Sequence, residues 1–129
     1  MLATSFYAAL LALFFVALSA RTIRMRRHFG IALGSADNND LLRATRVHAN
    51  FAEYTPLALL LILMLEIQGA SLAFVHILGV SLISGRLIHA QGVSQTNENT
   101  KYRVAGMVLT FTTIGSAALG IMLLYLSSN

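Results

Sequence analysis

Long apolar stretches alternate with short polar segments along the 129-residue chain. The apolar stretches cover about residues 2–20, 41–67, 70–90 and 101–126. A helix needs about 20 mostly apolar residues to cross the hydrocarbon of a bilayer, and each stretch reaches or approaches that length. The pattern therefore predicts an all-α integral membrane protein, with residues 1–129 forming a single domain whose protomer is a four-helix bundle.

The first stretch has a second interpretation, because small residues at positions 17–20 would also suit the cleavage site of a secretory signal. No basic residue precedes this stretch, and four arginines follow it closely. That order is the reverse of the charge order in a signal peptide. We therefore expect the first span to be retained.

Turn-forming and capping residues mark the expected helix ends. Residues 30–40 have the composition of a loop, and Asp40 is placed to cap the second helix. Gly69 interrupts the pattern before the third helix, and Asn99 or Thr100 is placed to cap the fourth after a polar connection at residues 91–100. Small residues in the last two spans predict close helix contacts, namely Gly79, Ser81, Ser84, Gly85, Gly106, Gly115, Ser116 and Gly120.

The distribution of charge predicts which connections between the helices face the cytoplasm. Only 11% of the residues are charged and 57% are hydrophobic, whereas about a quarter of a soluble domain is charged. The cations gather in and beside the first and third connections, and residues 68–71 carry none. By the positive-inside tendency, the first and third connections should face the cytoplasm. This placement explains the net charge of +4 without nucleic acid, for which no basic face with interleaved aromatics exists.

The chain has no cysteine, which removes disulfides, thiolate metal sites and a protein thiol nucleophile from consideration. We expect no metal site. Any thiol chemistry would have to use the sulfur of a substrate.

A polar stripe begins the second helix. Arg43, Arg46, Asn50 and Glu53 are separated by three, four and three residues, which places them on one helix face. Charged groups are costly to dehydrate in lipid, so the stripe should face a partner helix or a polar cavity, which a bend at Pro56 would help to open. From spacing alone, a ligand site and a set of interhelical contacts without a ligand remain equally open.

Other polar residues have plainer interpretations. Arg86 and His89 share one face of the third helix near its end, where a histidine is more often interfacial than catalytic. His76 is expected to take part in packing or hydrogen bonding, and His28 in the basic cluster should face lipid headgroups.

The segment at residues 43–56, RATRVHANFAEYTP, resembles the signature of the membrane-associated proteins in eicosanoid and glutathione metabolism, the MAPEG superfamily. Its arginine, asparagine, glutamate, tyrosine and proline all fall at the family's spacing, and the segment GRLIHAQG at residues 85–92 also fits. The family includes microsomal glutathione transferases and leukotriene synthases. The resemblance implies a homotrimer of four-helix protomers that holds glutathione between subunits near the cytoplasmic side of the membrane.

The resemblance also implies residue roles. Arg46, Asn50, Glu53 and Tyr54 would contact glutathione, with further contact positions at His48 and His89. Arg103 resembles the family arginine that stabilises the glutathione thiolate, and Arg27 resembles a second arginine near the site. The physical chemistry of these side chains agrees with the implied roles. The planar guanidinium of arginine can bind a carboxylate through two hydrogen bonds, and a cation at a helix N-terminus favours a thiolate. Arg103 also has a plainer, compatible role as a topology residue.

The leading expectation is an enzyme that conjugates glutathione to a hydrophobic electrophile from the bilayer, or uses it to reduce a lipid hydroperoxide. The alternative is a non-catalytic lipid-binding scaffold of the same fold. A small drug exporter is disfavoured, because residues 2–20 contain no acidic residue. His89 and Val93 stand where leukotriene synthases have tyrosines, which disfavours a leukotriene-type substrate. The short basic first loop resembles the bacterial branch, which implies a bacterial inner membrane protein.

Overall fold

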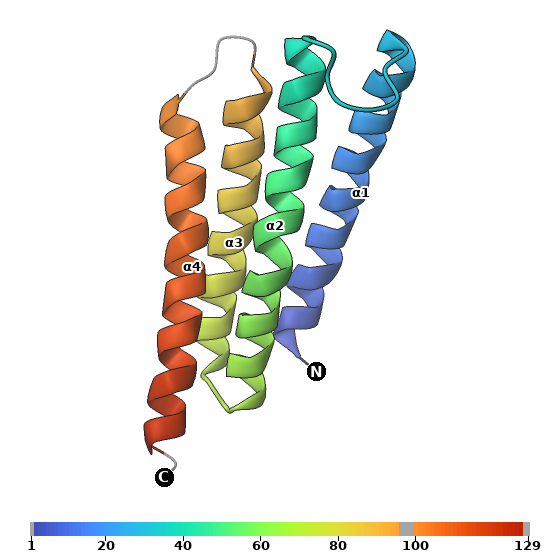
Figure 1. Ribbon diagram of the computed structural model, residues 1–129. Coiled ribbons are helices and arrows are strands. Elements are labelled where there is room, and N and C mark those ends of the chain that lie inside the picture. Colours follow the sequence, from blue (N-terminus) through green and yellow to red (C-terminus); the bar gives the residue numbers. More distant parts are fainter. Residues whose placement is uncertain (1, 96–99, 128–129) are drawn as a thin grey trace.

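The computed structural model describes residues 2–95 and 100–127. The helices of this part are α1 (Ala3–Phe29), α2 (Asn39–Ile67), α3 (Leu72–Ser94) and α4 (Thr100–Ser127). They lie side by side in an up-and-down arrangement, with α1 and α4 on the flanks (Figure 1). Each helix is long and apolar enough to cross a membrane. The all-helical architecture expected from the hydropathy pattern is therefore confirmed.

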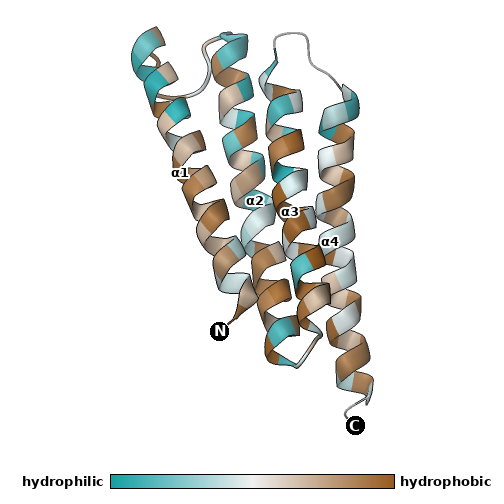
Figure 2. Ribbon diagram, turned by 180° about the vertical axis from the view of Figure 1, so that it is seen from behind, coloured by the Kyte–Doolittle hydropathy of each residue, from teal (hydrophilic) through white to brown (hydrophobic). Residues whose placement is uncertain are grey.

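Polar residues gather mostly at one end of the bundle, where the connection between α1 and α2 lies (Figure 2). We call this the basic end, since the last turn of α1 there carries Arg26, Arg27 and His28. The connection between α2 and α3 lies at the opposite end, as do the starts of α1 and α3. This polarity agrees with the charge asymmetry of the connections.

The first helix is longer than the apolar stretch predicts. It continues past residue 20 to Phe29 and ends at Gly30, whose φ of 67° is the left-handed conformation of a helix C-cap. The four arginines at residues 21–27 therefore lie on the last helical turns and not in a loop. Arginine is a good helix former, so the helix has no reason to stop where the hydrocarbon stops.

Two other helix ends differ from the expected positions. Asn38, not Asp40, caps α2, because its side-chain oxygen accepts the Leu41 N–H at 2.9 Å. Asp40 lies in the first turn, where a carboxylate is also favourable. At the far end of α3, residues 91–94 continue the helix and do not join the polar connection. The alternative cap at Asn99 lies outside the described residues, and α4 begins at Thr100.

At the end of the bundle away from the basic end, Glu66 joins α2 to the start of α1. Its carboxylate accepts the backbone N–H groups of Ala3 at 2.6 Å and Thr4 at 2.9 Å, and the Thr4 hydroxyl at 2.6 Å. A carboxylate from a different helix thus caps α1. The Tyr7 hydroxyl and His76 Nδ1 are 2.7 Å apart, so the hydrogen-bonding role expected for His76 is confirmed.

The closest helix contacts occur at glycines, as the sequence predicts. A Cβ on Gly106 of α4 would lie 2.6 Å from the Gly85 carbonyl oxygen and 2.6 Å from the His89 nitrogen of α3. A Cβ on Gly79 would overlap the ring of Tyr7 in the same way. Gly115, by contrast, is exposed and has no atom within 4 Å of its Cβ position. The seam between α3 and α4 therefore depends on Gly85 and Gly106.

We predict that Gly106→Ala destabilises the protein by about 1–3 kcal/mol, because the methyl group forces α3 and α4 apart. The matched control is Gly115→Ala on the same helix, which should be neutral or slightly stabilising because alanine favours helix more than glycine does. Thermal unfolding in mild detergent, followed by circular dichroism, measures both. Equal midpoints for the two variants would contradict the close packing of this seam.

Candidate ligand site at the basic end of the bundle

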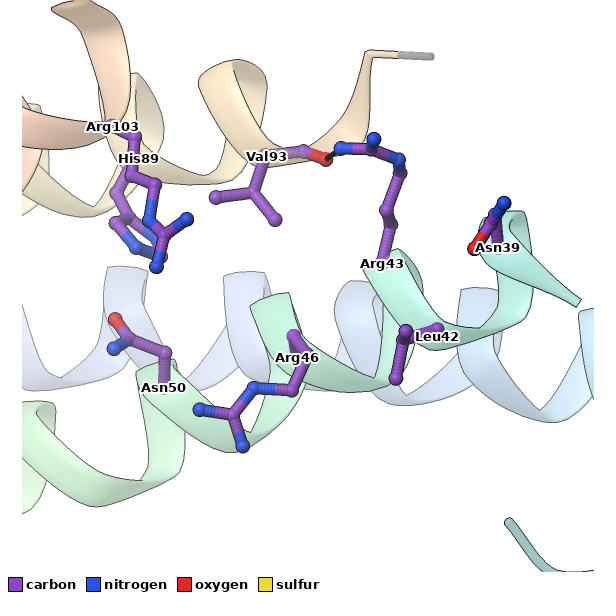
Figure 3. Close-up of a pocket in the computed structure, with 8 residues that line it drawn as sticks. All are labelled: Asn39, Leu42, Arg43, Arg46, Asn50, His89, Val93 and Arg103. Carbon is purple, nitrogen blue, oxygen red and sulfur yellow. Dashed lines mark hydrogen bonds between the residues drawn. The ribbon is translucent and has the colours of Figure 1, made fainter. Parts of the chain in front are cut away.

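A cavity of about 210 Å³ opens at the basic end between α2, α3 and α4. Its lining is mostly polar and is shown in Figure 3: Asn39, Leu42, Arg43, Arg46, Asn50, His89, Val93 and Arg103. The Arg103 guanidinium and the His89 ring face the side chain of Asn50 across the cavity (Figure 3). Within the residues described, α1 contributes nothing to this lining.

Helical spacing explains how the lining assembles. Arg43, Arg46 and Asn50 follow one another at intervals of three and four, so their side chains share one face of α2. His89 and Val93 are four apart on α3 in the same way. Because α2 and α3 both place these faces at the basic end, the two helices enclose the cavity, and Arg103 completes it from the first turns of α4.

The lining is strongly cationic. It contains three arginines and no acidic residue in the part of the chain that the structure describes. Arg43 is held toward α3, since its Nη1 donates to the Val93 carbonyl oxygen at 3.4 Å. Cations gathered in a concave site raise the local positive potential, so such a cavity favours anions and especially carboxylates, which match the arginine fork.

The cavity brings together four of the residues that the family resemblance implies as site residues, which are Arg46, Asn50, His89 and Arg103. The other four do not line it. Arg27 is exposed near the end of α1, on the far side of α2 from α4. Within the described chain, no contact joins α1 to α4.

The remaining three residues lie elsewhere on α2. His48 turns toward α1, where its Nε2 lies 3.0 Å from the Ser19 hydroxyl and its ring stacks on Phe15. Tyr54 packs edge-on against Phe111 of α4. Glu53 is exposed and keeps to the polar stripe, since seven residues from Arg46 leave it only about 20° off that residue's direction. It lies outside the lining because the cavity ends one turn earlier on α2, at Asn50.

Arg86 is the polar residue whose place the sequence does not predict. The sequence puts it beside His89 near the end of the third span, yet its side chain is only 2% exposed and is the largest fully buried one among the described residues. Its Nη1 donates to Asn50 Oδ1 at 2.7 Å, and its Nη2 donates to Thr110 Oγ1 at 2.6 Å. Its position eight residues before the end of α3 was the available signal, because an ionisable residue inside a span usually faces the bundle interior.

A second, apolar groove of about 250 Å³ lies between α1 and α2. Its lining residues are Ala8, Leu11, Ala12, Phe15, Phe51, Ala52, Thr55, Pro56 and Leu59. A cavity does lie beside Pro56, but it faces α1, whereas the sequence predicts a cavity beside the polar stripe. The polar cavity lies nearer the start of the helix.

These features define a helical protein with four span-capable helices and a mostly polar cavity, lined by three arginines, at one end of its bundle. The chain belongs to the MAPEG family, because residues 4–125 match that family's model. It is 35% identical over 108 residues to the inner membrane protein YecN of Escherichia coli strain K12, covering 84% of this chain and 81% of that protein. YecN of Escherichia coli O6:H1 shows the same identity and coverage. The family resemblance of the α2 signature is thus confirmed.

We predict that a small dicarboxylate stabilises the protein through this cavity. Glutarate should raise the thermal midpoint above that in sodium chloride of equal ionic strength, because an anion that binds only the folded state shifts unfolding by mass action. Arg46→Gln should lose at least half of the rise, whereas Arg24→Gln, which removes an exposed arginine of α1 outside the lining, should keep it. An equal rise in both variants would show that the effect does not arise at the cavity.

Proposed function

We propose that this protein is a membrane-bound glutathione transferase or glutathione-dependent peroxidase that acts on a hydrophobic electrophile from the bilayer. The observation that carries the proposal is the convergence of Arg46, Asn50 and Arg103 on one cavity. These residues belong to two different helices, and all three fall at positions that the family resemblance implies for glutathione. Membership of the MAPEG family, which includes glutathione transferases, supports it.

Glutathione suits the chemistry of the cavity. It carries two carboxylates, one amino group and one thiol, and its reactive form adds a third negative charge on sulfur. Arginine forks bind carboxylates through paired, charge-assisted hydrogen bonds, which suits Arg43 and Arg46. Arg103 lies in the first turns of α4, so its charge and the helix N-terminus both favour the thiolate.

One protomer supplies only part of the proposed site. The cavity of about 210 Å³ is smaller than the roughly 300 Å³ at which small-molecule sites usually begin. Glu53 and Arg46 are both exposed on a helix that can span a membrane, where uncovered charges are costly. We propose that two further copies cover these charges in a homotrimer, and that Glu53 then receives the amino group of glutathione.

The same assembly would bring Arg27 to the cavity from a neighbouring protomer. In its own protomer Arg27 lies on the flank opposite to α4, so it cannot join Arg103 there. Interfaces in a cyclic trimer are heterologous, so two different faces of the protomer meet. We propose that one of them is the α1 side.

In the conjugation reaction, the thiol first loses its proton to water. The thiolate sulfur then forms a bond to the electrophilic carbon as the leaving group departs with its electron pair. Arg103 holds the negative charge before the attack. The protein's own contribution is therefore to bind the tripeptide and to favour its ionised form.

We propose an inner membrane location with the basic end in the cytoplasm. The name of the relative YecN, the span-capable helices and the positive-inside tendency support this placement. The hydrophobic substrate would then approach laterally from the lipid while glutathione enters from the cytoplasm.

A second candidate is a lipid-binding scaffold without catalysis. The apolar groove between α1 and α2 favours it, because the groove would accept a hydrocarbon chain whether or not the cavity holds glutathione. A scaffold predicts lipid binding with no turnover of an electrophile, so an activity measurement separates the two candidates.

We predict that Arg103→Ala binds glutathione within a few-fold of the unmodified protein but raises the pKa of the bound thiol. A rise of one unit corresponds to about 1.4 kcal/mol and, near neutral pH, to nearly a tenfold loss of thiolate. Ultraviolet absorbance of the bound thiolate and turnover of 1-chloro-2,4-dinitrobenzene measure the two effects. Lys101→Ala, a neighbouring cation outside the lining, is the control. If Arg103→Ala keeps both its thiolate absorbance and its rate, Arg103 serves only to set the orientation of the protein in the membrane.

We also predict that two impaired variants, each lacking one arginine of the proposed site, recover activity when they are mixed. Arg27→Ala and Arg103→Ala subunits co-expressed in equal amounts should recover about a quarter of the sites, because a complete site then needs adjacent subunits of different type. Native mass spectrometry of the purified mixture verifies the trimer and its composition. Mixed trimers without recovered activity would contradict a site shared between protomers, and monomers or dimers alone would contradict the trimer itself.

A further inference from the structure

The first part of the connection between α1 and α2 folds back along the end of α1. The Ile31 N–H donates to the Arg26 carbonyl oxygen at 3.1 Å. Arg26 Nη1 then donates to the carbonyl oxygens of Ala32 at 3.2 Å and Gly34 at 3.0 Å. Figure 1 shows this connection passing beside the last turns of α1 before it reaches α2. One arginine side chain therefore holds residues 31–34 at its own level on α1.

Leu33 lies between the two carbonyl groups that Arg26 holds. Its side chain is 89% exposed, the largest exposed fraction among the large hydrophobic residues that the structure describes. Gly34 follows with a φ of 71°, a left-handed conformation that favours glycine, and turns the chain. Residues 31–34 carry no charge, and the first acidic residue after them is Asp37. The segment therefore presents one apolar side chain beside one cation.

The depth of this segment follows from the length of α1. The apolar stretch of the sequence ends at Ala20, which we take as the boundary of the hydrocarbon in the proposed membrane location. Arg26 lies six residues further along α1, about 9 Å along the helix axis. Helical side chains lean toward the N-terminus of their helix, so the guanidinium of Arg26 should lie nearer the boundary than its backbone does. The headgroup region is about 5–8 Å thick on each side of the hydrocarbon. Arg26 and the carbonyl groups that it holds therefore lie at headgroup depth.

We propose that Arg26 and Leu33 form an interfacial anchor that binds phospholipid of the leaflet at the basic end. The side chain of Leu33 enters the boundary between headgroups and acyl chains, where the apolar faces of interfacial segments are buried about 5–10 Å deep. Both bonds to the connection come from Nη1 of Arg26, and its Nε and Nη2 have no hydrogen-bond partner among the described residues. These two nitrogens donate to a lipid phosphate, an acceptor that suits the guanidinium.

The combination of the two side chains favours phospholipid as the occupant. An exposed leucine is ordinary by itself. A leucine held beside a cation at headgroup depth, however, has the composition of segments that lie in a membrane interface. Phospholipid supplies a phosphate for Arg26 and an acyl chain for Leu33, whereas water supplies a partner for the cation alone. The inference rests on the proposed membrane location and does not depend on glutathione.

A nitroxide spin label at residue 33 measures its depth. The chain has no cysteine, so Leu33→Cys carries a single label, and Ala36→Cys, further along the same connection, provides the comparison. In vesicles of phosphatidylcholine and phosphatidylglycerol, collisions with oxygen indicate lipid, and collisions with a water-soluble nickel chelate indicate water. The ratio of oxygen to nickel collisions should be at least about threefold higher at residue 33 than at residue 36, because only residue 33 is held at the acyl boundary.

Two results at residue 33 would overturn the anchor. Collisions mainly with the nickel chelate would place Leu33 in water, and few collisions with either reagent would place it against a second copy of the chain. Flotation of the labelled protein with the vesicles separates the anchor from the location on which it rests. Protein that does not float would contradict the membrane location as well, whereas protein that floats with residue 33 in water contradicts the anchor alone.

Arg26→Met in the Leu33→Cys protein tests the role of the arginine. Methionine keeps a good helix former at this position but cannot donate, so the collision ratio at residue 33 should fall at least about twofold. Arg24→Met is the matched control, because Arg24 is an exposed arginine of the same helix whose Nε donates to the Ala20 carbonyl oxygen at 3.3 Å within α1. Equal ratios in the two variants would show that Arg26 does not hold Leu33 at the membrane interface.

Discussion

The buried guanidinium of Arg86 is the interaction on which the basic half of the bundle depends. The Arg86 side chain is only 2% exposed, and a buried cation is costly unless its hydrogens are bonded. Here α2 and α4 supply acceptors for Nη1 and Nη2, whereas Nε has no hydrogen-bond partner among the described residues. That requirement fixes the spacing of three helices at one level. The glycine seam between α3 and α4 serves the same geometry, because the close approach at Gly106 brings Thr110 within reach. The cavity is built directly beyond this level.

The two ends of the bundle use charge in different ways. At the end with the α2–α3 connection, the carboxylate of Glu66 accepts hydrogen bonds from the first residues of α1. This negative charge is therefore stabilised within the protomer. At the basic end, three arginines converge with no acidic residue in the described lining. A membrane protein gains no stability from such convergence on its own, since like charges repel. An anion bound in the cavity would relieve this repulsion.

Much of this architecture could be predicted from the sequence, and the exceptions have physical reasons. The hydropathy pattern predicts the spans, and the intervals between Arg43, Arg46 and Asn50 predict a shared face. Hydropathy does not show where a helix ends once it leaves the hydrocarbon. The apolar pattern therefore does not predict the last turns of α1, between residue 20 and Phe29. The burial of Arg86 could not be predicted either. Its acceptors on α2 and α4 are distant in sequence, and only the packing of the helices brings them to Arg86.

The cost of the cationic cavity bears on how the protein is assembled as well as on what it binds. Any anion that enters relieves the repulsion among the arginines and stabilises the folded state by mass action. A second copy does something similar if it covers the exposed Glu53 and Arg46, because charges hidden from lipid no longer carry the full cost of dehydration. Binding and assembly therefore act on the same charged face of α2. In the proposed trimer, this coupling would favour a site shared between copies.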